Sequence, residues 1–290
     1  MKQWIFAAAM IVPLGPPAAT AGEKEVYRIG IAKGAVRDVP KDLLTTAGDS
    51  FRELMKGQTG LNGAVTLDQE WPRVARDLND GVLELGVLQG HEFAWARQKY
   101  PDLQPLVCTV ARPKPVTAYL LVLHDSKAAS LADLKDGKLV VTTAMKDHAR
   151  LFLAKRQAEE MGGSAFGSTA TADTAHEAIQ KVIDGEADLT VTDHSAWNHF
   201  QKLYPGASKN VKVMAESDEF PPTVLVYKKG GVDEAALKKL RDGLLTAHDT
   251  AKGTQLMRSV RIEKFGALPD GFEERVAACL KAYPPPRAEK

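Results

Sequence analysis

The side chain with the most distinctive chemistry in this sequence is the thiol of Cys108, because the chain has only two cysteines. Cys108 ends the apolar run Leu106-Val107-Cys108, which is typical of a buried strand. A thiolate is a soft ligand that binds thiophilic metals and metalloids. Three interpretations are open: Cys108 contacts a ligand, it forms a disulfide with Cys279, or it packs in the core as buried thiols often do.

Four of the seven histidines lie in polar segments next to carboxylates. These histidines are His91, His148, His176 and His194, and the carboxylates are Glu92, Asp147 and Asp193. Imidazole and carboxylate groups can hold a transition metal, but no two of these histidines have the close spacing of one helical face, such as H-x-x-x-H. We therefore expect no metal and no cofactor, and a polar cleft whose histidines hydrogen-bond a ligand or cap helices.

Motifs that mark the common catalytic sites are absent from the sequence. It contains no G-x-S-x-G elbow, no P-loop, no G-x-G-x-x-G segment and no zincin helix. Cys108 could act as a nucleophile only beside a basic partner, and no residue is marked by its spacing as that partner. The sequence therefore predicts a binding protein and not an enzyme.

The first residues have the three parts of a secretion signal. Lys2 is the only charge before Glu23, residues 4–14 are almost wholly apolar, and Ala19-Thr20-Ala21 is an A-x-A cleavage site. The apolar run is shorter than the ~20 residues that span a bilayer, which disfavours a membrane anchor. We expect residues 1–21 to be a signal peptide and the mature protein to be located in the periplasm.

The charge balance argues against large charged partners. The formal net charge is +1, and removal of Lys2 with the signal peptide leaves zero. A neutral surface provides no general attraction for nucleic acid or for an anionic membrane. The ligand must therefore be recognised at a local site, and we expect no nucleic acid among the partners.

The rest of the chain alternates short β-rich runs with amphipathic helical segments. Expected strands are residues 26–32, 63–67, 83–88, 103–110, 117–123, 139–143, 187–192, 211–215 and 223–228. Expected helices include residues 43–57, 72–80, 93–99, 175–184, 195–203, 234–246 and 272–282, with another that ends at Met161. Ser130 and Asp133 predict a short turn with a capping box. This alternation predicts βαβ units around mostly parallel sheets.

Two such series, with a late return of the chain, predict two α/β lobes joined by two crossing segments. The crossings are expected near residues 113–119 and 219–223, which are extended, proline-bearing stretches. Lobe 1 is expected to comprise residues 22–116 and 222–283, and lobe 2 residues 117–221. Residues 284–290 are expected to form a disordered tail.

Several segments, in a fixed order, resemble the phosphate/phosphite/phosphonate-binding family of ABC-transporter solute receptors. The matching segments are Glu70-Trp71-Pro72, Leu78-Asn79-Asp80-Gly81, Gln89-Gly90-His91-Glu92-Phe93-Ala94, residues 130–137 (SLADLKDG), Ala175-His176-Glu177-Ala178, residues 184–188 (DGEAD) and Thr192-Asp193-His194. Each segment alone is a weak signal, but together they span about residues 26–275. The resemblance implies a type II periplasmic-binding-protein fold of the α/β class, which closes about a two-segment hinge on a small ligand.

The departures from that family resemble its arsenite-sensing branch. Lys146-Asp147-His148-Ala149 stands where phosphonate receptors carry Ser-Thr-Ser-Gly at a helix start, and an aspartate there repels an oxyanion. His194 replaces the family's second aspartate, and Phe93 replaces its loop tyrosine. The arsenite-sensing branch holds its ligand with a cysteine on the strand of Cys108, so this resemblance implies arsenite as the ligand.

Two hypotheses for the function follow from the resemblance. The first is an arsenite receptor that signals to a membrane sensor histidine kinase controlling arsenite oxidation. The alternative is the substrate-binding component of an ABC transporter, which takes phosphate, phosphite or phosphonate and engages a permease. Trp71 either contacts the ligand or packs between the lobes. The expected ligand-binding residues are Cys108, Trp71, Gln89, His91, Thr143, Asp147, His148, His176 and Asp193.

Overall fold

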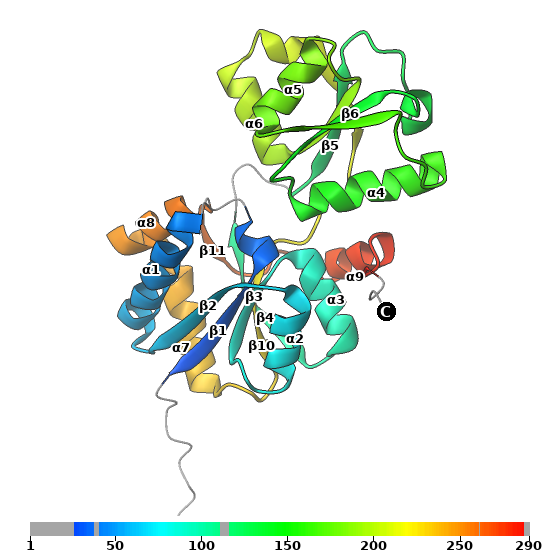
Figure 1. The fold of residues 1–290 in the computed structure, drawn as a ribbon. Helices are drawn as coiled ribbons and strands as arrows, with labels where there is room; N and C mark the ends of the chain where they lie inside the picture. The colour runs from blue at the N-terminus through cyan, green and yellow to red at the C-terminus, as the bar shows by residue number, and fades with distance from the viewer. Residues whose placement is uncertain (1–25, 38–40, 111–115, 261, 287–290) are drawn as a thin grey trace, which may run out of the picture.

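The computed structural model of the protein describes residues 26–37, 41–110, 116–260 and 262–286. The expected signal peptide, part of the first crossing segment and the end of the expected tail lie outside the described residues. The chain forms two sheets, each with helices on both faces, and Figure 1 shows them as two lobes, one above the other.

Lobe 1 is built on a six-stranded sheet with the strand order β11-β4-β10-β3-β1-β2. Its strands are β1 (Tyr27–Ala32), β2 (Gly63–Gln69), β3 (Leu85–Leu88), β4 (Leu103–Val110), β10 (Val224–Lys228) and β11 (Lys264–Gly266). β1 pairs in parallel with β2 and β3, as βαβ units require, whereas β10 is antiparallel to both β3 and β4. β10 has the opposite direction because the chain enters this sheet again after passing through lobe 2.

Lobe 2 is built on a five-stranded sheet with the order β7-β6-β8-β5-β9. Its strands are β5 (Ala118–Leu123), β6 (Lys138–Thr142), β7 (Ser168–Ala172), β8 (Leu189–Asp193) and β9 (Val211–Glu216). β6 is parallel to β7 and β8, and β5 is antiparallel to β8 and β9. The carboxyl ends of β6, β7 and β8 therefore lie at the same edge of the sheet, and the helices that follow these strands begin at that edge.

Helices cover both faces of each sheet, as the hydrophobic periodicity predicts. In lobe 1, α1 (Lys41–Thr59), α7 (Glu234–Leu245) and α8 (Ala251–Ser259) pack on one face, and α2 (Trp71–Asn79), α3 (Gly90–Lys99) and α9 (Phe272–Ala282) on the other. In lobe 2, α4 (Asp147–Met161) packs on one face, and α5 (Ala175–Ile183) and α6 (His194–Leu203) on the other. The described residues also form the short 3-10 helices η1 (Lys33–Val36), η2 (Leu131–Leu134), η3 (Ala207–Asn210) and η4 (Ala247–Asp249).

The alternation of side chains along the strands divides the core of lobe 1 into two layers. In β10, Leu225 packs on the side of α1 and α7, whereas Val224 and Val226 pack on the side of α2, α3 and α9. Val107 and Cys108 of β4 are divided between the two layers in the same way. A fully buried aliphatic side chain contributes about 1.5–3 kcal/mol, so these layers hold the sheet and its helices together.

The two crossing segments lie side by side between the lobes. The backbone N–H of Phe220 donates to the carbonyl oxygen of Val116, and that of Ser217 donates to Ala118, both at 2.9 Å. Two α/β lobes with these strand orders and a paired double connection confirm the expected type II periplasmic-binding-protein fold. The boundary residues of the lobes stay predictions.

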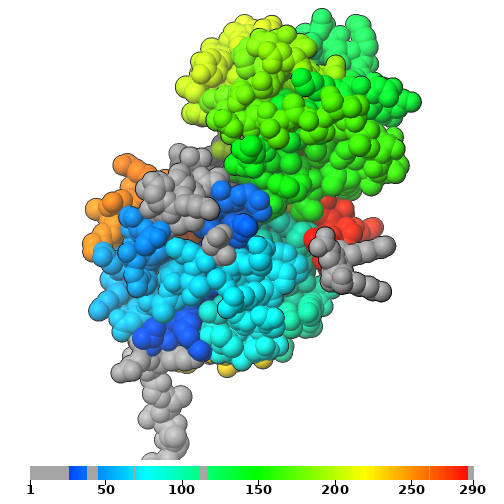
Figure 2. Space-filling model, viewed as in Figure 1, coloured from blue at the N-terminus to red at the C-terminus, as the bar shows by residue number. Residues whose placement is uncertain are grey.

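The lobes touch each other beside the crossings. Figure 2 shows them as two masses that meet where the blue segment containing η1 and the red α9 approach lobe 2. An ion pair between Arg37 and Asp147 joins the lobes there, and Leu151 of lobe 2 packs against the apolar cluster of Phe220, Cys279 and Tyr283. No helix in the part of the chain that the structure describes is both long and apolar enough to span a membrane.

Gly90, the first residue of α3, packs directly against the second crossing segment. A Cβ atom at this position would lie 2.0 Å from the carbonyl oxygen of Pro221, which the backbone cannot accommodate without moving. We expect Gly90→Ala to lower the free energy of unfolding by about 1–3 kcal/mol through overpacking. Urea denaturation measures this, with Gly206→Ala as the control because a Cβ there meets no atom within 4 Å. Equal losses in the two variants would contradict the prediction.

Candidate ligand-binding site

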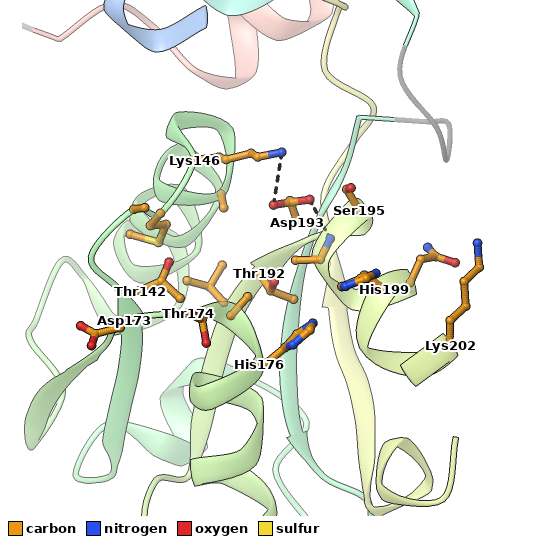
Figure 3. Close-up of a pocket in the computed structure, with 17 residues that line it drawn as sticks. Thr142, Lys146, Asp173, Thr174, His176, Thr192, Asp193, Ser195, His199 and Lys202 are labelled. Atoms are coloured by element: carbon orange, nitrogen blue, oxygen red, sulfur yellow. Dashed lines mark hydrogen bonds and ion pairs between the residues drawn. The ribbon is translucent and has the colours of Figure 1, made fainter. Parts of the chain in front are cut away.

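A cavity of about 670 Å³ lies in lobe 2, where β6, β7 and β8 end and the following helices begin. Open α/β sheets commonly bind ligands at this edge, and the volume is within the range of small-molecule sites. Its polar lining residues are Thr142, Lys146, Asp173, Thr174, His176, Thr192, Asp193, Ser195, Asn198, His199 and Lys202 (Figure 3).

Three helices, α4, α5 and α6, begin at this cavity and contribute the partial positive charge of their N-termini to its wall. The first N–H groups of a helix have no acceptor within the helix and carry partial positive charge. The side chains of Thr174 and Asp193 cap α5 and α6, whereas Lys146 makes no side-chain cap at the start of α4. The start of α4 therefore keeps donors available for an oxygen atom of a ligand.

Lys146 and Asp193 form a charged pair at one end of the cavity. The Nζ atom of Lys146 lies 3.7 Å from an oxygen of Asp193, and Figure 3 shows the two side chains pointing toward one another. Burial of Asp193 favours its neutral form, but the charges of Lys146 and His148 and backbone N–H groups outweigh this effect and lower its pKa. Asp193 is therefore an ionised acceptor within the cavity, and Lys146 is the cation beside it.

His176 and His199 stack in the same cavity, with ring centroids 5.0 Å apart. Burial lowers the pKa of His176, and the charge of His199 acts in the same direction. His176 is therefore neutral at physiological pH and offers one donor and one acceptor to a ligand.

Asp147 turns away from the cavity and bridges the two lobes. The guanidinium group of Arg37, which follows η1 in lobe 1, lies 3.0 Å from one carboxylate oxygen of Asp147 and 3.1 Å from the other. The cavity is lined by Lys146 and Ala149 on either side of Asp147 but not by Asp147 or His148. The negative charge of Asp147 is therefore balanced by lobe 1.

Glu92 is buried on the lobe 1 side of this contact and is only 4% exposed. One carboxylate oxygen accepts from the backbone N–H of Gln89 at 2.8 Å, which completes a capping box at the start of α3. A Cβ atom on Gly34 would lie 2.5 Å from the other oxygen and 3.1 Å from an oxygen of Asp147, so the two carboxyl groups converge at this glycine. Burial, reinforced by the charge of Asp147, raises the pKa of Glu92 to about 8.

His91 and His148 approach one aromatic ring from opposite lobes. The ring centroid of Phe220, in the second crossing segment, lies 6.3 Å from that of His91 and 5.5 Å from that of His148. Phe220 also stacks on Tyr283, just after α9, at 4.6 Å. Burial is the main effect that lowers the pKa of His91 to about 3, so its imidazole is neutral.

Cys108 lies in the core of lobe 1 and not at the cavity. Its side chain is 3% exposed, it packs beneath α9, and its Sγ atom donates to the carbonyl oxygen of Ala267 at 3.3 Å. Cys279 lies in another apolar cluster, around Phe220, and no disulfide joins the two cysteines in the described structure. Of the three interpretations drawn from the sequence, this placement agrees with a core thiol, and it does not support a ligand contact through Cys108.

Three further residues expected at the ligand site lie outside the cavity lining. Trp71 begins α2 and packs on the indole ring of Trp95 in α3, with ring centroids 5.4 Å apart. The side-chain amide of Gln89 donates to the carbonyl oxygen of Gly34 and joins the start of α3 to η1. Thr143 follows β6, and the cavity is lined by its neighbour Thr142.

The structure therefore divides the nine expected residues among different places. His176 and Asp193 line the cavity. His91, Asp147 and His148 lie where the lobes meet, with Glu92. Their contacts with a ligand stay predictions.

Several residues that line the cavity are not among those predicted from the sequence. Lys146 was recognised only as a departure from a family motif, although a lysine at a helix start after a buried strand is a signal for anion binding. Ser195, His199 and Lys202 all lie on α6, where their spacing of four and three residues places them along one side of the helix. That helical spacing was the available signal.

A family model described as "ABC transporter, phosphonate, periplasmic substrate-binding protein" matches residues 34–270. No functionally curated protein matches the sequence. The matched residues run from within η1 to a few residues beyond β11, so they include the cavity, the second crossing segment, the whole sheet of lobe 2 and the sheet of lobe 1 except β1.

Solved structures share the fold at low sequence identity. A protein of Xanthomonas citri bound to ATP has a TM-score of 0.63 at 16% identity, over 90% of this chain and 97% of that chain. A binding-protein component of an ABC phosphonate transporter from Pseudomonas aeruginosa has a TM-score of 0.58 at 17% identity, with 89% and 86% covered. PhnD1 from Prochlorococcus marinus in complex with methylphosphonate has a TM-score of 0.58 at 14% identity, with 89% and 97% covered. At these identities the likeness shows the fold alone.

The family match and the architecture agree with each other. The matched family consists of solute-binding proteins of the periplasm, and the two-lobed fold with a double connection is the architecture of such receptors. This chain belongs to the family of periplasmic substrate-binding proteins of phosphonate ABC transporters.

Proposed function

We propose that this protein is the substrate-binding component of an ABC transporter and that it binds a small phosphonate-type oxyanion in the cavity of lobe 2. The observation that carries the proposal is the cavity, where three helix starts, several hydroxyl groups and Lys146 come together. Helix N–H groups and a cation provide the donors that a tetrahedral oxyanion requires. The ligand then stabilises the closed receptor by binding it more tightly than the open one.

The position of Asp147 removes the main argument from the sequence against an oxyanion. The sequence places this aspartate where phosphonate receptors have hydroxyl groups, so repulsion of the ligand was expected. The side chain instead pairs with Arg37, and the cavity wall next to it is formed by Lys146 and Ala149. The start of α4 therefore keeps its positive character toward the cavity.

Asp193 provides a basis for selectivity among oxyanions. As an ionised carboxylate it can only accept a hydrogen bond, so it favours a ligand that still carries a proton on one oxygen. Phosphate and phosphonate carry such a proton near neutral pH, whereas sulfate does not. We infer that sulfate is rejected although its size and charge are similar.

The arsenite receptor that signals to a histidine kinase is the less supported hypothesis. This hypothesis requires the Cys108 thiolate to reach a bound arsenite. The thiol instead lies buried beneath α9 and donates a hydrogen bond to the carbonyl oxygen of Ala267. The family match favours a permease as the membrane partner over a sensor kinase. The experiment that tests the proposal therefore includes arsenite as a competing ligand.

Thermal denaturation of the chelator-treated, metal-free mature protein with methylphosphonate, phosphite, phosphate, sulfate or arsenite tests the proposal. A ligand at a hundred times its Kd stabilises the folded state by about 2.7 kcal/mol, which raises Tm by several degrees. We expect at least one of the three phosphorus oxyanions to raise Tm, and sulfate and arsenite to leave it unchanged. A shift with arsenite alone that disappears in Cys108→Ala would overturn the proposal in favour of the arsenite receptor.

A further inference from the structure

Three side chains with metal-ligating atoms converge at the contact between the lobes, away from the cavity. They are His91 and Glu92 at the start of α3 in lobe 1, and Asp147 at the start of α4 in lobe 2. One ring nitrogen of His91 and one oxygen of each carboxyl group lie within 4.8 Å of one another. Ligands of a tetrahedral Zn²⁺ lie about 3.4 Å apart, at bonds of about 2.1 Å, so small side-chain rotations would bring all three to one ion.

His91 is 3% exposed, and its imidazole makes no hydrogen bond with another side chain or with the backbone within the described residues. Its recorded contacts are with the aromatic rings of Trp95 and Phe220. A largely buried imidazole has lost most of its hydrogen bonds with water, which is costly unless another partner replaces them. A metal ion would provide such a partner for one ring nitrogen of His91, which lies within 4.8 Å of the two carboxylate oxygens.

The two carboxyl groups also lack a full set of partners. Glu92 uses one oxygen to accept from the backbone N–H of Gln89, and its other oxygen points toward Gly34. Because Gly34 has no side chain, the space between this oxygen and the nearest oxygen of Asp147 is not filled by a Cβ atom. The converging oxygens leave room for a small cation.

Arg37 is the cationic side chain paired with Asp147 at this contact, and its role must be compatible with a bound cation. Its guanidinium group approaches both oxygens of Asp147 from lobe 1, and its side chain is 31% exposed. Ligating carboxylates are commonly hydrogen-bonded by an outer group that orients them. Metal binding requires the deprotonated form of both carboxyl groups, and a divalent cation would offset the negative charge that Arg37 alone does not balance.

We propose that His91, Glu92 and Asp147 bind a divalent transition-metal ion such as Zn²⁺, and that the ion ties the two lobes together. One imidazole and two carboxylates favour Zn²⁺ or a neighbouring transition metal over Mg²⁺ and Ca²⁺, which prefer oxygen ligands alone. Because the ligands come from both lobes, the ion stabilises the arrangement in which the lobes are in contact. This proposal replaces the expectation from the sequence that no metal is bound.

Equilibrium dialysis of the chelator-treated mature protein against Zn²⁺, and visible absorption with Co²⁺ as a spectroscopic probe, test the site. We expect one bound ion per chain, and about 10–100-fold or greater weakening of the Kd for Zn²⁺ in Asp147→Asn and in His91→Phe. His91→Phe retains a ring against Trp95 and Phe220. Asp147→Asn retains the size and shape of the aspartate side chain at the start of α4. Because two variants in different lobes are used, the test does not depend on the folding of either one alone.

The matched control is His199→Phe, because the stacked rings of His176 and His199 lie outside the proposed site and could themselves bind Zn²⁺. We expect this variant to bind Zn²⁺ as the wild type does. Absence of tight Zn²⁺ binding, or binding lost in His199→Phe and retained in His91→Phe, would overturn the proposal. Neither result bears on the oxyanion in the cavity, because that ligand is tested in metal-free protein.

Discussion

Replacement of Phe220 by alanine is expected to lower the free energy of unfolding by about 3–5 kcal/mol, the range for a fully buried phenylalanine. The side chain is 2% exposed and stacks on Tyr283 with ring centroids 4.6 Å apart. It also contacts His148 of lobe 2 and His91 of lobe 1. The substitution therefore leaves a cavity at the point where the hinge, both lobes and the segment after α9 meet.

Urea denaturation followed by tryptophan fluorescence measures this loss. Phe220→Leu is the graded control, because it keeps most of the volume but not the ring contacts, and we expect it to lose less than the alanine variant. Tyr204→Ala is the control for an exposed aromatic residue, since Tyr204 is 48% exposed, and its expected loss is below about 1 kcal/mol. A loss for Phe220→Ala as small as that for Tyr204→Ala would show that this ring does not hold the lobes together.

Much of the fold was predictable because its local signals are strong. The expected helix over residues 272–282 is confirmed with its bounds, and the capping box of Ser130 and Asp133 is confirmed at the start of η2. β7 was missed because Ser168–Ala172 is a small, mostly exposed edge strand without an apolar alternation. β11 was not predicted because it has only three residues and is the edge strand of its sheet, where it pairs with β4. Edge strands carry weak sequence signals since they bury little surface.

The candidate site was less predictable because its geometry depends on which way each side chain turns. Cys108 and Val107 are neighbours on one strand, and the sequence does not determine which sheet face each one takes. Asp147 was placed correctly at a helix start, but its partner Arg37 lies 110 positions earlier in the chain. Contacts of this kind arise from the packing of two lobes, and no local pattern encodes them.

Lys146 carries the second large effect, on the affinity for an oxyanion. Lys146 precedes α4, and its ammonium group lies 3.7 Å from a carboxylate oxygen of Asp193, which precedes α6. Both residues line the cavity in which we propose that methylphosphonate binds. Loss of a charged group that pairs with a bound ligand costs about 2–5 kcal/mol of binding free energy. Because the Lys146 side chain is 32% exposed, we expect the lower end of this range in Lys146→Met. A loss of about 2 kcal/mol corresponds to a roughly 30-fold higher Kd.

Isothermal titration calorimetry with methylphosphonate measures the change, in metal-free protein. Lys146→Arg keeps the charge and is expected to retain most of the affinity. Lys155→Met is the matched control on the same helix, because Lys155 pairs with Glu159 and does not line the cavity. If Lys146→Met bound methylphosphonate as tightly as Lys155→Met does, the ligand would have to lie elsewhere than at the start of α4. The positive ends of α5 and α6 would then be the remaining donors, and Lys202 the cation to replace next.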